Sequence, residues 1–181
     1  MEIERPSLRT LVGKNNLVGA EIGIRWGKNA KNILTILDIS VLYLIDPYLP
    51  YPTGNVPERI KYLVEHEQEK VFSTAKNNLK EYEDKIIWIR GFSWDVVDKI
   101  PELDFVYIDG DHRLESVRRD LELYYPKVVT GGLVSGHDYI IVNIEVDRFF
   151  NSNVIKNFEN DWWIIKSEPA IDLVRWEYTN D

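Results

Sequence analysis

The stretch that decides the fold is LVGAEIGIRWG, which runs from Leu17 to Gly27. A short apolar run ends at the acidic residue Glu21, and Gly23 and Gly27 follow it in the pattern E-x-G-x-x-x-G. Glycines at these positions allow a tight turn from a strand into a helix and let backbone N–H groups approach a ligand. After the first strand of an α/β sheet, such a turn is typical of a nucleotide-like binding site. The spacing differs from the dinucleotide pattern G-x-G-x-x-G, which indicates a ligand without a pyrophosphate.

The composition predicts one globular domain over 1–181, with 1–16 as a lead-in to the first strand. The absence of cysteine excludes disulfides and thiolate metal sites, and it fits a reducing, cytoplasmic location. The N-terminus lacks the apolar run of a signal peptide, and no segment reaches membrane-spanning length. The net charge of -8 repels phosphate backbones. We therefore expect neither nucleic acid nor membrane as a partner.

Apolar runs alternate with amphipathic stretches, which predicts a parallel sheet with crossover helices in three layers. We expect strands at Leu17–Ile22, Val41–Asp46, Ile86–Arg90, Asp104–Asp109 and Gly132–Gly136. The helices expected between and after them are Asn29–Leu37, Glu65–Tyr82, Trp94–Lys99, Leu114–Tyr125 and Ile144–Asn151. Two further strands, Trp162–Ser167 and Ile171–Tyr178, finish the chain like a hairpin and bring the total to seven. The proline-rich segment Pro47–Arg59 is a candidate lid beside the site.

Acidic residues lie at or near the carboxyl ends of four predicted strands. They are Glu21, Asp46, Asp109 and Asp138. In an open α/β sheet, ligands bind at this edge. Asp46 ends the second strand, where its carboxylate can accept hydrogen bonds from both hydroxyls of a ribose. The alternative for Asp46 is to stabilise the turn that follows it, but its place after the glycine turn favours ribose.

A second group of residues, in the motifs DGDH and HD, gathers at the fourth and fifth strand ends. Asp109 and Asp138 could share one magnesium ion, since oxygen ligands from neighbouring strand ends suit a hard cation. Asp111 would then accept a proton from a hydroxyl group, or alternatively cap the helix that follows it. His112 and His137 either orient an aspartate or contact the substrate.

The third element is Arg90-Gly91-Phe92-Ser93-Trp94, directly after the third strand. A turn here can place Ser93 and the ring of Trp94 beside an aromatic base. The alternative is that Ser93 caps the following helix while Trp94 packs in the core.

Together these motifs resemble class I S-adenosylmethionine-dependent methyltransferases. The acidic strand end and glycine turn of that family match EIGIRWG, its ribose-binding acid matches Asp46, and its Gly-x-Ser near adenine matches Gly91 and Ser93. The resemblance implies a Rossmann-like, mostly parallel sheet of seven strands whose last strand is antiparallel. It extends from about Leu17 to Phe150.

Within that class, the segment VYIDGDHRLESVRRDLELYYPKVVTGGLVSGHDY resembles the macrocin O-methyltransferase-like group. Its fourth strand ends in D-G-D-H, and its fifth ends in G-G-x-x-x-G-x-D-Y. Members of the group are magnesium-dependent O-methyltransferases of natural-product sugars, which implies metal ligands at Asp109 and Asp138 and a general base at Asp111. This chain has His137 where larger members carry another aspartate. Its lead-in also leaves little room for an N-terminal cap over the acceptor.

The sequence therefore predicts S-adenosylmethionine-dependent O-methylation of a small-molecule or sugar hydroxyl, with magnesium as the candidate metal. The expected catalytic residues are Asp111 and His112, and the expected metal ligands are Asp109, Asp138 and His137. The expected cofactor-binding residues are Glu21, Gly23, Gly27, Asp46, Ser93, Trp94 and Asp109.

Two alternatives stay open at this point. An NAD(P)-dependent oxidoreductase would need a different glycine spacing. A non-catalytic binding module on the same fold fits the histidine in the metal motif and the short lead-in. Six tryptophans and ten tyrosines also leave room for an interface between copies of the chain.

Overall fold

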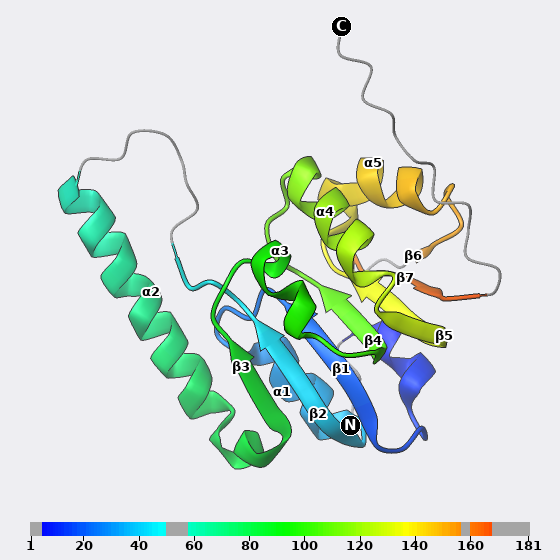
Figure 1. Cartoon of the computed structure of the whole chain (residues 1–181), viewed down its shortest axis with the longest axis horizontal. Helices are drawn as coiled ribbons and strands as arrows, with labels where there is room; N and C mark the ends of the chain where they lie inside the picture. Colours follow the sequence, from blue (N-terminus) through cyan, green and yellow to red (C-terminus); the bar gives the residue numbers. More distant parts are fainter. Residues whose placement is uncertain (1–4, 50–57, 157–159, 168–181) are drawn as a thin grey trace, which may run out of the picture.

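The computed structural model describes residues 5–49, 58–156 and 160–167. One sheet holds the strands in the order β3-β2-β1-β4-β5-β7-β6 (Figure 1). The strands are β1 (Leu17–Ile22), β2 (Ile39–Ile45), β3 (Ile86–Ile89), β4 (Leu103–Ile108), β5 (Val128–Gly136), β6 (Ile155–Lys156) and β7 (Trp162–Ile165). The first five are parallel, whereas β7 runs antiparallel to β5 and β6 antiparallel to β7. The order reverses between β1 and β4, which is where such sheets bind ligands.

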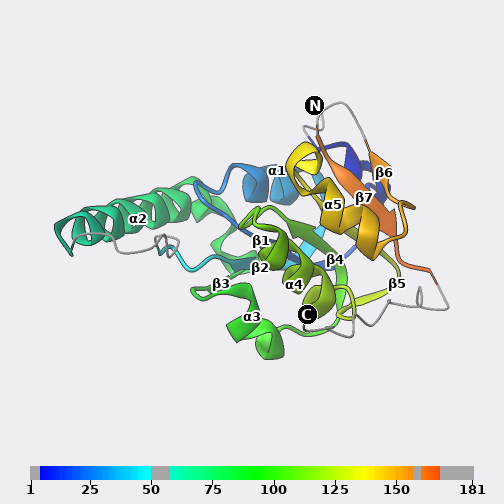
Figure 2. The ribbon, with the colours of Figure 1, turned by 90° about the horizontal axis from the view of Figure 1, so that it is seen from above.

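Helices cover both faces of the sheet and make three layers (Figure 2). The helices are α1 (Lys28–Ile36), α2 (Glu58–Asn78), α3 (Ser93–Val96), α4 (Leu114–Tyr124) and α5 (Tyr139–Phe149), with 3-10 turns η1 (Pro6–Leu11), η2 (Lys80–Lys85) and η3 (Val97–Lys99). One apolar cluster joins the sheet to η1, α1 and α2, and a second joins it to α3, α4 and α5. Helix α2 lies beside β3, and its first turns extend beyond the strand ends (Figure 1). No helix in the described ranges has both the length and the apolar character needed to cross a bilayer.

Strand β4 lies at the centre of the fold and is buried on both faces. Phe105 and Tyr107 pack into the cluster with α1 and α2, while Val106 and Ile108 pack into the cluster with α4 and α5. A parallel strand covered by helices on both sides reads as a continuous apolar run. The expectation from DFVYID is confirmed. Because β4 ends at Ile108, the next residue, Asp109, lies at the edge of the sheet.

The bounds of several elements differ from the predicted ones. Strand β5 begins at Val128 rather than Gly132, because Val128 is buried and pairs with Leu103 ahead of a register shift. Helix α5 begins at Tyr139 rather than Ile144. The exposed isoleucines of its first turns, including Ile140, break the amphipathic pattern that usually reveals a helix start. Helix α2 begins at Glu58, seven residues before the predicted start.

The predicted count of seven strands needs correction. Among the residues that the structure describes, six strands have four or more residues, and the two-residue β6 takes the outermost place in the sheet. The antiparallel strand expected from Trp162 is confirmed as β7. The expected strand Ile171–Tyr178 lies outside the described residues, as do 50–57 of the candidate lid.

Candidate active site

The carboxyl ends of the central strands open into a cleft of about 1100 Å³. Eight of the residues predicted from the sequence line it: Glu21, Gly23, Asp46, Asp109, Asp111, His112, His137 and Asp138. They come from four separate strand ends and the loops that follow. Parallel strands bring these ends to one edge, so residues more than 100 positions apart meet in a single cavity.

The glycine turn packs directly on the end of β4. Gly23 has a φ of +86°, and a Cβ built on it would lie 2.2 Å from the carbonyl oxygen of Asp109. Its N–H donates to the carbonyl of Ile45 at 2.9 Å. The close approach predicted for this glycine is therefore an approach to the protein's own backbone, and it fixes the turn against Asp109. Gly27 precedes α1 and contacts Leu79 rather than the cleft.

Asp46 connects the glycine turn to the end of β2 through hydrogen bonds. Its Oδ2 accepts hydrogen bonds from the N–H groups of Ile24 at 2.8 Å and Arg25 at 3.0 Å. Its Oδ1 accepts one from the N–H of Tyr48 at 2.7 Å, the turn role considered as an alternative. A carboxylate has about four acceptor positions. Three are occupied here, which leaves room for one ribose hydroxyl rather than both.

Glu21 is a buried acid at the end of β1. Only 1% of it is exposed. Its Oε1 accepts a hydrogen bond from Asn29 Nδ2 at 3.1 Å, and its Oε2 has no hydrogen-bond partner among the described residues. Burial raises the pKa of Glu21 to about 8, so the side chain carries its proton at neutral pH. A protonated acid can donate a hydrogen bond into the cleft.

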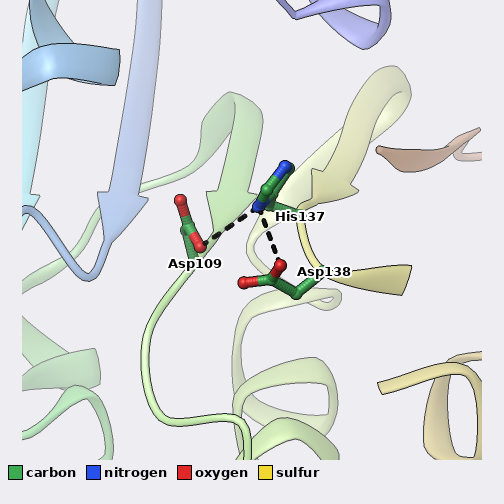
Figure 3. A group of neighbouring side chains, drawn as sticks. All are labelled: Asp109, His137 and Asp138. Carbon is green, nitrogen blue, oxygen red and sulfur yellow. Dashed lines mark ion pairs between the residues drawn. The ribbon is translucent and has the colours of Figure 1, made fainter. Parts of the chain in front are cut away.

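Asp109, His137 and Asp138 form a compact group across the ends of β4 and β5 (Figure 3). One ligand atom from each lies within 4.8 Å of the others. His137 Nδ1 is 3.3 Å from Asp138 Oδ1 and 3.9 Å from Asp109 Oδ1. Asp138 has a φ of 54° as the chain turns from β5 into α5, and Asn160 Nδ2 donates to its Oδ1 at 3.1 Å. Two carboxylates and one imidazole are a donor set that a divalent cation accepts.

His112 lies against the same group. Its Nε2 is 3.1 Å from Asp138 Oδ2 and 3.8 Å from Asp109 Oδ1. Asp109 above all, and then the charge of Asp138, raise the pKa of His112 against the opposing effect of partial burial. His112 therefore stands beside the candidate metal ligands, as an orienting or proton-exchanging residue would.

Asp111 has a different environment from the one predicted for a general base. Its Oδ1 accepts the N–H of Arg113 at 3.1 Å, and its Oδ2 accepts Arg113 Nε at 2.6 Å and Ser116 Oγ at 2.7 Å. Although partial burial acts in the opposite direction, the bonds from Ser116 and Arg113 lower the pKa of Asp111. The carboxylate ties the loop to Ser116 in the first turn of α4, although the N-cap of that helix is Arg113 and not Asp111 as the alternative expected. It is a poor proton acceptor in this arrangement.

Ser93 and Trp94 do not line the cleft. Ser93 is buried as the first residue of α3, not its N-cap, and its hydroxyl donates to Asp120 on α4. Trp94 stacks on Phe92 at 4.7 Å between ring centroids, and the guanidinium of Arg119 lies 4.6 Å over its ring. Both side chains that the sequence analysis placed beside adenine therefore contact residues of α4 instead.

Residues 20–139 match a family profile described as a methyltransferase domain. The chain belongs to this family of methyltransferase domains. The match includes the glycine turn and both strand-end motifs, and it confirms the resemblance to class I S-adenosylmethionine-dependent methyltransferases. A comparison with curated protein sequences gave no match.

Solved structures share the fold of this methyltransferase domain. The O-methyltransferase NovP is 18% identical, with a TM-score of 0.62 over 91% of this chain and 78% of that one. CalS11, a TDP-rhamnose 3'-O-methyltransferase of calicheamicin biosynthesis, is 13% identical, with a TM-score of 0.56 over 88% and 75%. An rRNA methylase from Streptococcus thermophilus is 10% identical, with a TM-score of 0.64 over 93% and 100%. Identities this low show the common fold alone.

The methyltransferase cleft is also lined by residues that the sequence analysis did not assign to the site, among them Arg5, Trp26 and Gln68. Trp26 lies inside the glycine motif, and 42% of it is exposed in the structure. A large apolar residue within a predicted ligand-binding turn was the signal that the sequence offered. Arg5 and Gln68 carry no such signal, because the tertiary fold alone brings the segment before η1 and helix α2 to the cleft.

Proposed function

We propose that this methyltransferase transfers the methyl group of S-adenosylmethionine to a hydroxyl of a small molecule or sugar, with the help of a divalent cation. The observation that carries the proposal is the Asp109–His137–Asp138 group, which shares one cleft with the glycine turn. One cleft could therefore hold both the cofactor and the cation.

The residues that would hold the cofactor are Glu21, Gly23 and Asp46. S-adenosylmethionine supplies the activated methyl group when it is bound. Asp46 offers one remaining acceptor position to a ribose hydroxyl, and the protonated Glu21 can donate from Oε2. Together they would fix the ligand along the edge from β2 to β4, which is the alignment that an in-line displacement needs.

The residues that would hold the cation are Asp109, His137 and Asp138. A bound divalent cation lowers the pKa of an acceptor hydroxyl. Carboxylates suit Mg²⁺ and Mn²⁺, whereas an imidazole favours Mn²⁺ and later transition metals. His137 in place of a carboxylate therefore leads us to propose that Mn²⁺ serves at least as well as Mg²⁺.

Of the two catalytic candidates, His112 is better placed than Asp111 to accept the proton of the acceptor. His112 would accept the proton of the acceptor hydroxyl, to which the bound cofactor would supply the methyl group. A histidine exchanges protons near neutral pH, whereas the carboxylate of Asp111 is occupied by Arg113 and Ser116.

A pair of substitutions separates these roles. We expect His112→Gln to lower kcat by about 100-fold, the usual scale for loss of general base catalysis. Asp111→Asn should lower kcat by less than about 5-fold, since it only weakens the loop contact with α4. Calorimetry should find S-adenosylmethionine bound equally well by both variants. The larger loss in Asp111→Asn would restore the aspartate as the base.

The class of acceptor is proposed from likeness and charge. CalS11 acts on a nucleotide-linked sugar, and NovP is an O-methyltransferase, which supports a hydroxyl acceptor. The rRNA methylase neighbour raises RNA as a second possibility. The net charge of -8 disfavours RNA, because a phosphate backbone would be repelled.

The decisive experiment is a methyl-transfer assay on a panel of sugar and phenol hydroxyls after treatment with a chelator. We expect turnover to fall by about 100-fold and to return with added Mn²⁺ or Mg²⁺. The variant Asp138→Asn should lose this response to metal. Turnover that is indifferent to the chelator would remove the cation from the mechanism. Binding of S-adenosylmethionine without turnover on any acceptor would favour the non-catalytic module.

A further inference from the structure

Arg5 is a cationic residue that reaches the cleft from the segment before η1. It lines the cleft, and 22% of its side chain is exposed. Its guanidinium lies 5.9 Å from the centroid of the Tyr107 ring on β4. The side chain is therefore held at the β4 side of the cleft, away from Asp46 at the end of β2.

A buried carboxylate anchors one side of this guanidinium. Asp161, which is fully buried, accepts hydrogen bonds from Ser7 Oγ at 3.1 Å, from Tyr107 Oη at 2.9 Å and from Arg5 Nη1 at 3.4 Å. A charge removed from water needs a partner of opposite sign. Arg5 supplies it, so its position is determined by residues outside the cleft.

The other side of the guanidinium faces the cleft. Nη2 lies 3.9 Å from Asp109 Oδ2, which is too long for a hydrogen bond. Among the described residues, none accepts a hydrogen bond from Nη2. A guanidinium binds carboxylates through two parallel N–H groups, and here donors remain for a ligand.

The charges around Arg5 match an amino acid that carries both of its charges. Two acids lie at this end of the cleft: Asp109, whose Oδ2 is 3.9 Å from Arg5 Nη2, and the protonated Glu21, whose Oε2 has no hydrogen-bond partner among the described residues. Arg113, another cation of the lining, is paired with Asp111 at 2.6 Å. A ligand with its ribose at Asp46 would place its amino-acid end here, with its ammonium facing the acids. Its carboxylate needs a cation, and Arg5 is the one beside them.

We infer that Arg5 binds the carboxylate of the cofactor's amino-acid end and makes the site selective for ligands that carry it. This inference rests on the proposed function, because it takes S-adenosylmethionine as the ligand. It assigns to the segment before β1 a direct part in cofactor recognition.

The test compares S-adenosylmethionine with its decarboxylated analogue by calorimetry. The wild-type protein should bind S-adenosylmethionine at least about 10-fold more tightly, the scale of one charged hydrogen-bonded pair. Arg5→Gln should lose this preference, and Arg5→Lys should keep part of it. Arg9→Gln is the matched control, because Arg9 is exposed on η1 and does not line the cleft. It should retain the full preference.

Loss of Arg5 also removes its hydrogen bond to the buried Asp161 and could weaken the fold, so a second comparison separates stability from recognition. Asp161→Asn should keep the preference for the carboxylate, whereas Arg5→Gln with Asp161→Asn should lose it. Equal binding of both ligands by the wild-type protein, or an equal loss of both in Arg5→Gln, would overturn the inference while the proposed function stands. Failure of the wild-type protein to bind S-adenosylmethionine would overturn both.

Discussion

Gly23→Ala should destabilise the fold by about 3 kcal/mol and weaken binding of S-adenosylmethionine by at least about 100-fold. The new Cβ would lie 2.2 Å from the carbonyl oxygen of Asp109 and 2.6 Å from Gly110 Cα, both of them backbone atoms. Neither can rotate away, so the turn must separate from β4. That movement shifts Asp109 relative to Glu21 and opens the cleft at its centre. Urea unfolding and calorimetry measure the two effects.

Gly13→Ala is the matched control for this substitution. Gly13 has the same φ of +86°, but nothing lies within 4 Å of a Cβ built there. It should therefore show the conformational cost alone, about 1 kcal/mol, with unchanged cofactor affinity. Equal losses of stability in the two variants would mean that strain, not contact with β4, explains the need for Gly23.

The central sheet was predictable from the sequence because buried strands have a recognisable pattern of apolar residues. Strand β1 has the predicted bounds, and β4 has the continuous apolar run of a doubly covered strand. The start of β5 was missed because Gly131, just before the predicted start at Gly132, resembles a turn residue, whereas it lies inside the strand near a register shift. The start of α5 was missed because its exposed isoleucines hide the apolar face.

The candidate site was predictable as far as topology determines it. Strand-end acids meet because parallel strands place their carboxyl ends at one edge, and this brought Asp109 and Asp138 together without knowledge of side-chain packing. The roles of single side chains depend on partners far along the chain. Ser93 donates a hydrogen bond to Asp120, and Arg5 donates one to Asp161, which is 156 positions away. No local pattern records such contacts.

The position of Glu21 follows from the sheet topology, whereas its protonation state follows from side-chain packing. Burial raises its pKa from 4.5 to about 8. Below pH 4.5 the folded and unfolded chains both hold the proton. Between pH 4.5 and 8 the unfolded chain releases it while the folded chain keeps it, so a rise in pH favours unfolding. Above pH 8 both forms are ionised, and the loss of stability is complete.

Glu21→Gln should therefore become more stabilising, relative to wild type, as the pH rises. We expect the two proteins to unfold nearly alike at pH 4.5 and the variant to be more stable by about 5 kcal/mol at pH 9. The amide has the shape of the protonated acid, so it keeps the contact with Asn29 and cannot ionise. Urea unfolding across this pH range measures the difference. Glu122→Gln, at an exposed position of α4, should run parallel to wild type at every pH. Parallel curves for Glu21→Gln as well would show that Glu21 is already ionised in the folded protein, and it could then only accept hydrogen bonds from a ligand.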